Sequence, residues 1–287
     1  MQFPHRPDTE IIPIREPQRV LYTHVAISSQ PANFPPSTCS LITCYSTSKL
    51  DYHEKISLTI NHMKYSMILS WLVTLLVPIA LIGLGLRLLL SPLFLQIEYN
   101  MPYFPPDEYG FTKEDRLKWA PLALDYLTND EDISFLGDLQ FENGTPLYNE
   151  RELSHMDDVK IVTQGALRVW YAALVVLLLL GVWAWSAGWW QEYLIGLRRG
   201  GWLMVGLAVT VGLIVVIGIL INPNVFWNFF AGFHSLFFEG DSWLFLYSDT
   251  LIRLFPIRFW QDAFLWAAVV ALGGGFALAL GLRSALR

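Results

Sequence analysis

Four stretches of this 287-residue chain are long and apolar enough to cross a lipid bilayer. A hydrocarbon core about 30 Å thick takes roughly 20 helical residues. The stretches cover residues 66–91, 167–189, 201–221 and 261–282. Hydrophobic residues make up 54% of the chain and charged residues only 15%, which excludes an ordinary soluble domain. The sequence therefore predicts an all-α membrane protein with four transmembrane helices.

The positions of lysine and arginine around these stretches predict the orientation of the chain. Cations gather before the first span, in the short second connection and after the last span; they are Lys55, Lys64, Arg198, Arg199, Arg283 and Arg287. Because cytoplasmic loops and span ends carry the excess of lysine and arginine, we expect these ends to be cytoplasmic. Both termini then lie on the cytoplasmic side of a bacterial cell membrane. Residues 92–166 and 222–260 lie on its external side.

Residues 1–60 differ in composition from the rest of the chain. They are rich in proline, serine and threonine, and they contain both cysteines, Cys39 and Cys44. No apolar run among them is long enough for a secretory signal. We expect a disordered tail here, followed by a four-span membrane domain over residues 61–287.

The long connection over residues 92–166 is predicted to form a small external α/β cap. It carries fifteen Asp or Glu against five Lys or Arg, which is typical of a solvated, translocated surface. The prolines and turn residues over 97–110 favour extended chain or short strands, and a helix is expected to begin at Thr112. Because no basic patch is interleaved with aromatic residues, nucleic acid is not an expected partner.

The second external segment, residues 222–260, is predicted to hold an aromatic-rich helix. Asn222 can cap this helix, and Pro223 suits its first turn. Much of the aromatic content is expected from the interfacial belt of a membrane protein. His234 lies among phenylalanines, where an imidazole without a partner has a desolvation cost of roughly a few kcal/mol. His234 is therefore either a hydrogen-bonded packing residue or a functional one.

The other histidine between spans, His155, lies near the start of a predicted helix that continues into the second span. Asn149 is a suitable N-cap, and Glu152 occupies the third helical position. Helical spacing places Glu152, His155 and Asp158 on one stripe. A carboxylate one turn from an imidazole can accept its second N–H and raise its basicity, as a general base requires. The alternative interpretation is a solvated helix end that carries charges.

Three runs in a fixed order, beside a single span and a polar external segment, resemble a known family. The runs are Glu-x-x-His-Met-x-Asp-Val-Lys from Glu152, Phe-His-x-x-Phe-Phe from Phe233, and Leu-Ile-x-Leu-x-Pro-x-x-Phe from Leu251. Together they are similar to the four-span bacterial family that includes the lipoprotein intramolecular transacylase. The resemblance covers residues 65–285, and its motifs are specific in combination.

The resemblance implies a reaction and two residues that perform it. In this family the sn-2 acyl chain of a diacylglyceryl lipoprotein moves to the α-amine of its lipidated N-terminal cysteine, and the motif histidines correspond to His155 and His234. One imidazole can take a proton from the α-ammonium, whose reference pKa is about 7.7–8.0. The other can stabilise the oxyanion and protonate the leaving oxygen. His155 is the predicted base because Glu152 can orient it.

Partners and cofactors are implied by the same resemblance. The expected partners are a lipidated lipoprotein substrate and membrane lipids, and neither a cofactor nor a metal is expected. Asp158, Asp241 and Arg253 join Glu152 as candidates for orienting the histidines or contacting the substrate headgroup.

Other classes of function stay open from the residues alone. Phe230-x-x-x-His234 matches one motif of the glutamic intramembrane proteases, but the paired glutamates followed by arginine are missing. A zinc hydrolase could use both histidines and a carboxylate, although no close histidine or cysteine pair supplies the usual spacing. A non-enzymatic membrane scaffold or lipid-binding protein is the third alternative, and it predicts that replacing either histidine leaves function intact.

Overall fold

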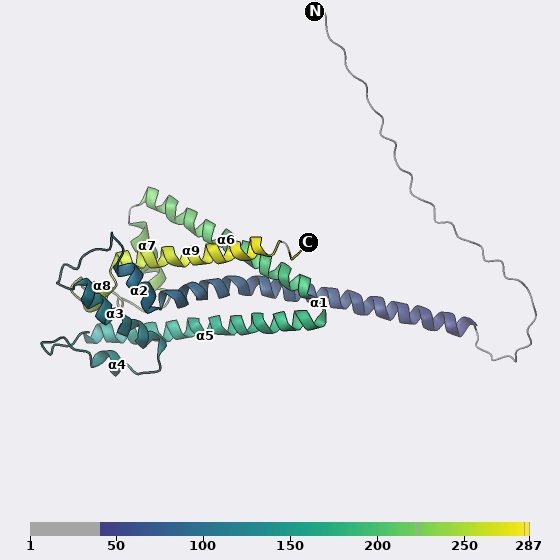
Figure 1. Ribbon diagram of the computed structural model, residues 1–287, viewed down its shortest axis with the longest axis horizontal. Coiled ribbons are helices and arrows are strands. Elements are labelled where there is room, and N and C mark those ends of the chain that lie inside the picture. The colour runs from purple at the N-terminus through teal and green to yellow at the C-terminus, as the bar shows by residue number, and fades with distance from the viewer. Residues whose placement is uncertain (1–40, 223, 284, 287) are drawn as a thin grey trace, which may run out of the picture. The chain divides into compact units, whose positions relative to one another are not determined.

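The computed structural model describes residues 41–222, 224–283 and 285–286, and most of these residues are helical (Figure 1). The chain divides into two compact units, Met1–His53 and Glu54–Arg287, and the fold described below is that of the second. Residues 1–40 of the predicted disordered tail lie outside the described residues. Residues 41–60 belong to helix α1, Leu41–Leu89, which begins earlier than predicted because no glycine or proline interrupts the chain between Pro36 and Pro78.

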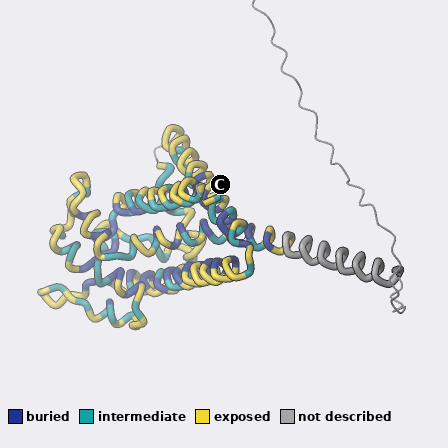
Figure 2. Tube along the Cα trace, turned by 45° about the vertical axis from the view of Figure 1, so that its right-hand side comes forward, coloured by how far each residue is buried: buried dark blue, intermediate teal, exposed yellow. Residues whose placement is uncertain are grey.

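Four of the described helices are long and apolar enough to span a membrane, as predicted. After α1, the elements are α2 (Pro92–Tyr99), α3 (Lys113–Thr128), α4 (Ser134–Gly137), α5 (Glu150–Ala187), α6 (Trp190–Ile221), α7 (Val225–His234), α8 (Thr250–Leu254) and α9 (Ile257–Gly281). The spans are Lys64–Leu89 within α1 and the helices α5, α6 and α9. Many of their residues are exposed (Figure 2), and these include many large apolar ones. In an all-α membrane protein such residues contact lipid.

The short helices gather at one end of the four long ones, which we call the capped end (Figure 1). Its core combines residues of α2, α3, α5, α8 and α9. The hydroxyl of Tyr99 donates a hydrogen bond to the Leu254 carbonyl over 3.0 Å, and Nε of Arg116 donates one to the Arg253 carbonyl over 2.9 Å. These bonds join the two connections, 92–166 and 222–260, which the sequence placed on one side of the membrane.

The capped end is more helical than the sequence predicted, because helix α2 overlaps the start of the segment 97–110 that was predicted to be extended, while the rest of that segment is non-helical. Ser91 accepts a hydrogen bond from the Phe94 amide over 3.3 Å and Pro92 lies in the first turn, so helix α2 begins there and buries Leu95 and Tyr99. The β pairing found in the described chain is one isolated bridge between residues 140 and 146. The α/β description of the cap is therefore corrected to a helical one. The predicted helix start at Thr112 is confirmed, with a complete capping box.

Glycines allow α6 to approach its neighbours closely. A Cβ on Gly201 would lie 2.7 Å from the Gly275 carbonyl oxygen of α9 and 3.0 Å from the Ala279 nitrogen. A Cβ on Gly200 would lie 2.5 Å from Cβ of Val77 in α1. Small residues at such crossings let helix backbones pack against each other in a membrane.

Gly201→Val is expected to destabilise the bundle, because its side chain meets the backbone of α9. Overpacking of this kind costs about 1–3 kcal/mol. For a chain of this size that loss lowers the melting temperature by roughly 2–4 °C per kcal/mol. Thermal unfolding in detergent measures the effect, and Gly206→Val is the matched control because a Cβ at Gly206 meets nothing within 4 Å. Equal melting temperatures for the two variants would contradict the packing described here.

Candidate active site

His155 lies in the second turn of α5, at the capped end. Asn149 caps this helix: its side chain accepts a hydrogen bond from the Glu152 amide, while the Glu152 carboxylate accepts one from the Asn149 amide. The N-cap at Asn149 and the position of Glu152 are those predicted from the sequence, and the structure adds the reciprocal bond. It starts the helix so that the His155 side chain lies inside the capped end, with 7% of the residue exposed.

His234 is the last residue of α7 and lies beside His155. The two ring centroids are 6.3 Å apart, and the ring planes differ by 23°. His234 is 8% exposed. The two histidines that the sequence singled out are separated by two spans along the chain. In the structure they are neighbours.

Aromatic side chains surround the pair, and we call four of them the aromatic cluster. The cluster comprises Phe230, Phe238, Trp243 and Phe245. The ring of His155 lies 4.8 Å from Phe238 and 5.3 Å from Phe245. The ring of His234 lies 4.0 Å from Phe230 and 5.0 Å from Trp243. Three of the four residues belong to the segment between α7 and α8, so this segment covers both histidines.

The hydrogen bonds of the two imidazoles differ. Nδ1 of His234 lies 2.9 Å from the Phe230 carbonyl oxygen. A carbonyl only accepts, so Nδ1 donates in this bond, and in the neutral ring Nε2 then keeps its lone pair. Burial lowers the pKa of His234 below its usual value, and the bond to Phe230 opposes that shift. Nδ1 of His155 is buried and has no hydrogen-bond partner in the described chain.

Glu152 does not orient His155, contrary to the sequence prediction. One carboxylate oxygen accepts a hydrogen bond from the Asn149 amide over 2.9 Å, and the other accepts one from the Leu251 amide over 2.7 Å. Glu152 is only 1% exposed. Its carboxylate joins the start of α5 to α8, because two backbone N–H groups use both of its oxygens. The reason for choosing His155 as the base is therefore absent.

The other three candidate residues are not bonded to the histidines in the described structure. Asp158 is exposed on α5. Asp241 is exposed too, and its backbone carbonyl accepts a hydrogen bond from Arg151 over 3.0 Å. Nε of Arg253 binds Asp107 over 3.1 Å, and the guanidinium lies 3.5 Å from the Phe111 ring centroid. Arg253 therefore serves to hold the 92–166 connection against α8.

Two groups were missed by sequence reasoning. The indole nitrogen of Trp243 is buried without a hydrogen-bond acceptor, beside His234. Glu98 in α2 is 0% exposed, and burial together with the Asp262 carboxyl raises its pKa to about 7. The tryptophan resembled interfacial belt residues, and Glu98 lay in a segment predicted to be extended. No local signal in the sequence separated either from those interpretations.

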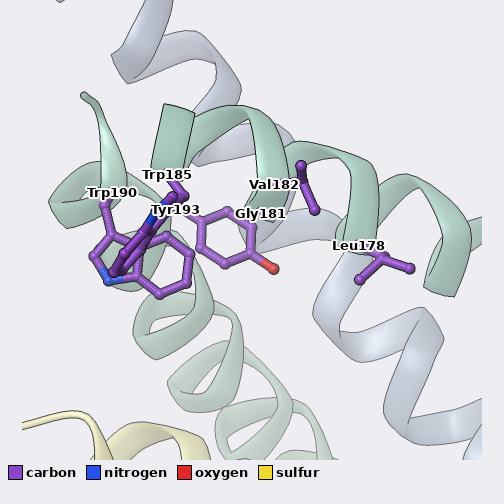
Figure 3. A pocket seen from close by; sticks show the side chains of 6 residues that line it. All are labelled: Leu178, Gly181, Val182, Trp185, Trp190 and Tyr193. Carbon is purple, nitrogen blue, oxygen red and sulfur yellow. The ribbon is translucent and has the colours of Figure 1, made fainter. Parts of the chain in front are cut away.

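A groove of about 370 Å³ lies near the α5–α6 turn, away from the histidines (Figure 3). It is lined by Leu178, Gly181, Val182, Trp185, Trp190 and Tyr193. Leu178 lies about 35 Å along α5 from His155 at 1.5 Å per residue. Among the described residues, no three His, Cys, Asp or Glu side chains are grouped so that they could hold a metal ion.

Fold and site together define a multi-pass membrane protein with two buried imidazoles at one end of its bundle. The family model described as lipoprotein intramolecular transacylase Lit matches residues 67–260. An uncharacterized protein of Aquifex aeolicus (strain VF5) is 31% identical over 205 residues, which are 71% of this chain and 88% of that protein. Because the family match covers more than half of the chain, the chain belongs to the lipoprotein intramolecular transacylase family and is a bacterial membrane enzyme.

Solved structures share the fold. The in meso structure of Lit from Bacillus cereus is 20% identical, with a TM-score of 0.62, and the match covers 79% of this chain and 96% of that one. A variant of the same protein with one histidine replaced by alanine is 19% identical, with a TM-score of 0.57 over 79% of this chain and 96% of that chain.

Proposed function

We propose that this enzyme moves the sn-2 acyl chain of a diacylglyceryl lipoprotein to the α-amine of the lipidated N-terminal cysteine, using His155 and His234. The observation that carries the proposal is the separation of the two buried rings, 6.3 Å between centroids, in a chain of this family. An imidazole bonds to an atom about 2.8 Å from its nitrogen. Both rings can therefore reach one substrate headgroup.

The reaction is a rearrangement within one substrate. The α-ammonium loses a proton, and the free amine attacks the carbonyl carbon of the sn-2 ester. The tetrahedral intermediate carries its negative charge on the former carbonyl oxygen. As it collapses, the bond to the glyceryl oxygen breaks and the nitrogen loses a second proton. The glyceryl oxygen takes up one of the two protons and solvent receives the other, so an amide and a free hydroxyl replace the amine and the ester.

His234 is assigned as the base in this proposal. Its Nδ1 proton is bonded to the Phe230 carbonyl, so Nε2 is the nitrogen that accepts a proton. The lowered pKa of the buried ring keeps it neutral at neutral pH. The substrate ammonium has a reference pKa of about 7.7–8.0, so a neutral imidazole competes for its proton at modest cost.

His155 is assigned as the group that faces the leaving glyceryl oxygen. A neutral imidazole has one N–H and one free nitrogen, so it can donate its proton to the oxygen as the ester bond breaks while its other nitrogen takes the second proton lost by the substrate nitrogen. Its Nδ1 has no partner in the described protein, so the ring is free to bond to a substrate atom. The aromatic cluster excludes water around both rings, which favours aminolysis over hydrolysis of the ester.

The orientation of the chain belongs to the same proposal. The cations at Arg198 and Arg199, and those at the chain end, favour cytoplasmic termini, and the capped end then lies outside the cytoplasm. The α-amine and the glyceryl ester must meet the histidines on that side. A cysteine introduced at the exposed Asp130 should react with a membrane-impermeant thiol reagent in intact cells. Labelling only after lysis would reverse the orientation.

Mass spectrometry of a reporter lipoprotein tests the function. The reporter is expressed with the wild-type chain in a strain that otherwise makes only the diacylglyceryl form, and its N-terminal peptide is analysed. Wild type should yield the N-acyl form with one ester-linked chain, and the His155→Ala/His234→Ala double variant should yield the unchanged diacyl form. An unchanged diacyl form with wild type, at equal membrane abundance, would contradict the transacylase proposal.

A further inference from the structure

We propose that the indole N–H of Trp243 donates a hydrogen bond to the former ester carbonyl oxygen when it becomes negatively charged. Trp243 would then be a catalytic residue beside the two histidines. This inference rests on the proposed transacylation and adds the group that stabilises its oxyanion. Preorganised donors aimed at a developing charge are usually among the largest contributors to catalysis of acyl transfer.

The first support is the position of Trp243. It lies in the segment between α7 and α8, and its ring centroid is 5.0 Å from that of His234. The rings of Phe230 and Trp227 also lie close to the indole, at 6.4 Å and 6.2 Å between centroids. The indole is thus held among rings, and it is next to the imidazole that we assign as the base.

The second support is an unpaired donor. Nε1 of Trp243 is buried, and no acceptor bonds to it in the described protein. A buried donor without an acceptor costs about 1–3 kcal/mol. The buried Nδ1 of His155 lacks a partner as well. Two polar atoms at the aromatic cluster are therefore without a hydrogen-bond partner from the described protein, and a bound substrate could supply one to each. An ester carbonyl that enters the cluster supplies an acceptor for the indole.

An unpaired indole alone does not make a site, as Trp189 shows. Its Nε1 is also buried without a partner, but it lies at the α5–α6 turn, where Trp183 and Tyr193 pack against it. No histidine ring contact accompanies it among the residues that the structure describes. The combination of an unpaired N–H with two imidazoles occurs, among the described residues, at Trp243.

The nearby cations do not replace this donor. Arg151 lies 6.0 Å from the Phe245 ring centroid, is exposed, and bonds to the Asp241 carbonyl. Arg253 is held by Asp107 and by the Tyr109 carbonyl. An indole N–H stays protonated throughout the reaction, so it stabilises the oxyanion without competing for the protons that the histidines move.

The test compares purified wild type with two replacements of Trp243, using a synthetic diacylglyceryl-cysteine lipopeptide in detergent. Trp243→Phe removes the N–H and part of the ring. Incorporation of benzothienylalanine at position 243 replaces N–H by sulfur and keeps the bicyclic shape. Loss of one oxyanion donor lowers kcat by roughly 100- to 1,000-fold. We expect that loss for both variants, with KM changed by less than about threefold because the donor acts mainly in the transition state.

Trp227→Phe is the matched control. This substitution also removes an indole N–H. The native Trp227 is 48% exposed and packs on Trp243 rather than on a histidine. Its kcat should stay within about threefold of wild type. A kcat equal to that of wild type in the benzothienylalanine variant would overturn the inference, even if Trp243→Phe is inactive or unfolded. Turnover by the wild-type enzyme in the same assay would still support the proposed function. An inactive wild type would overturn both.

Discussion

His234→Gln is expected to reduce kcat for lipopeptide transacylation by roughly 100- to 10,000-fold, the usual contribution of a general base. Glutamine retains a polar head that fits near the Phe230 carbonyl, but it cannot take a proton from an ammonium ion. His155→Gln should be less severe, because its amide N–H can still bond to the leaving oxygen. Initial rates of the purified variants, measured with the same lipopeptide, give both values.

The pH profile separates the base from a packing residue. Burial lowers the pKa of His234, so the active neutral form exists above that pKa and is lost as the pH falls through it. The acid limb from this ring therefore lies below about pH 6.5, the usual value for histidine. The substrate ammonium contributes another limb nearer pH 8. In wild type kcat/KM should fall more steeply below pH 6.5, and His234→Gln should keep only the substrate limb. The same steepening in the variant, or a greater loss for His155→Gln, would reverse the assignment.

Glu152→Ala is expected to unfold the capped end more readily. The substitution leaves the Asn149 and Leu251 amides without their acceptor, and each buried unpaired donor costs about 1–3 kcal/mol. The two donors together cost about 2–6 kcal/mol, which lowers the melting temperature by roughly 4–24 °C at 2–4 °C per kcal/mol. Differential scanning fluorimetry in detergent measures it.

A second Glu152 variant distinguishes this structural role from the predicted catalytic one. Glu152→Gln places an amide NH₂ where a carboxylate oxygen accepts a bond, so stability should fall and the remaining folded protein should keep its kcat. Asp158→Asn is the control, because Asp158 is exposed on the same helix and should leave both quantities unchanged. A fall in kcat with no loss of stability in Glu152→Gln would mean that this carboxylate acts on His155 after all.

The features that the sequence predicted well are those with local or compositional causes. The four spans follow from apolar length, and the caps at Thr112 and Asn149 follow from side chains that bond to amides three residues away. Topology placed His155 and His234 on one side of the bundle and the family resemblance implied that they act together, whereas their contact is a result of the structure. Each of these inferences needed only short-range chemistry or the alternation of sides across a membrane.

The features that were missed depend on contacts between distant residues. The Glu152 carboxylate bonds to Leu251, 99 positions later, whereas helical spacing suggested its neighbour His155. Trp243 is one of many aromatic residues near a membrane interface, and only its unpaired nitrogen and its contact with His234 distinguish it. The last residues of helix α2, 97–99, were predicted to be extended because prolines follow them closely.

The length of α5 makes bilayer thickness a variable of this enzyme. The helix has 38 residues, which is about 57 Å at 1.5 Å per residue, against a hydrocarbon core of about 30 Å. The sequence places the second span at residues 167–189, so His155 is expected on the part that extends beyond the core. Hydrophobic mismatch tilts or shifts such a helix, which changes the height of the imidazole above the lipid surface. The acyl chains of the substrate hold its ester at a depth that the same lipids set. Membrane composition therefore changes the distance between the ester and the imidazole of His155.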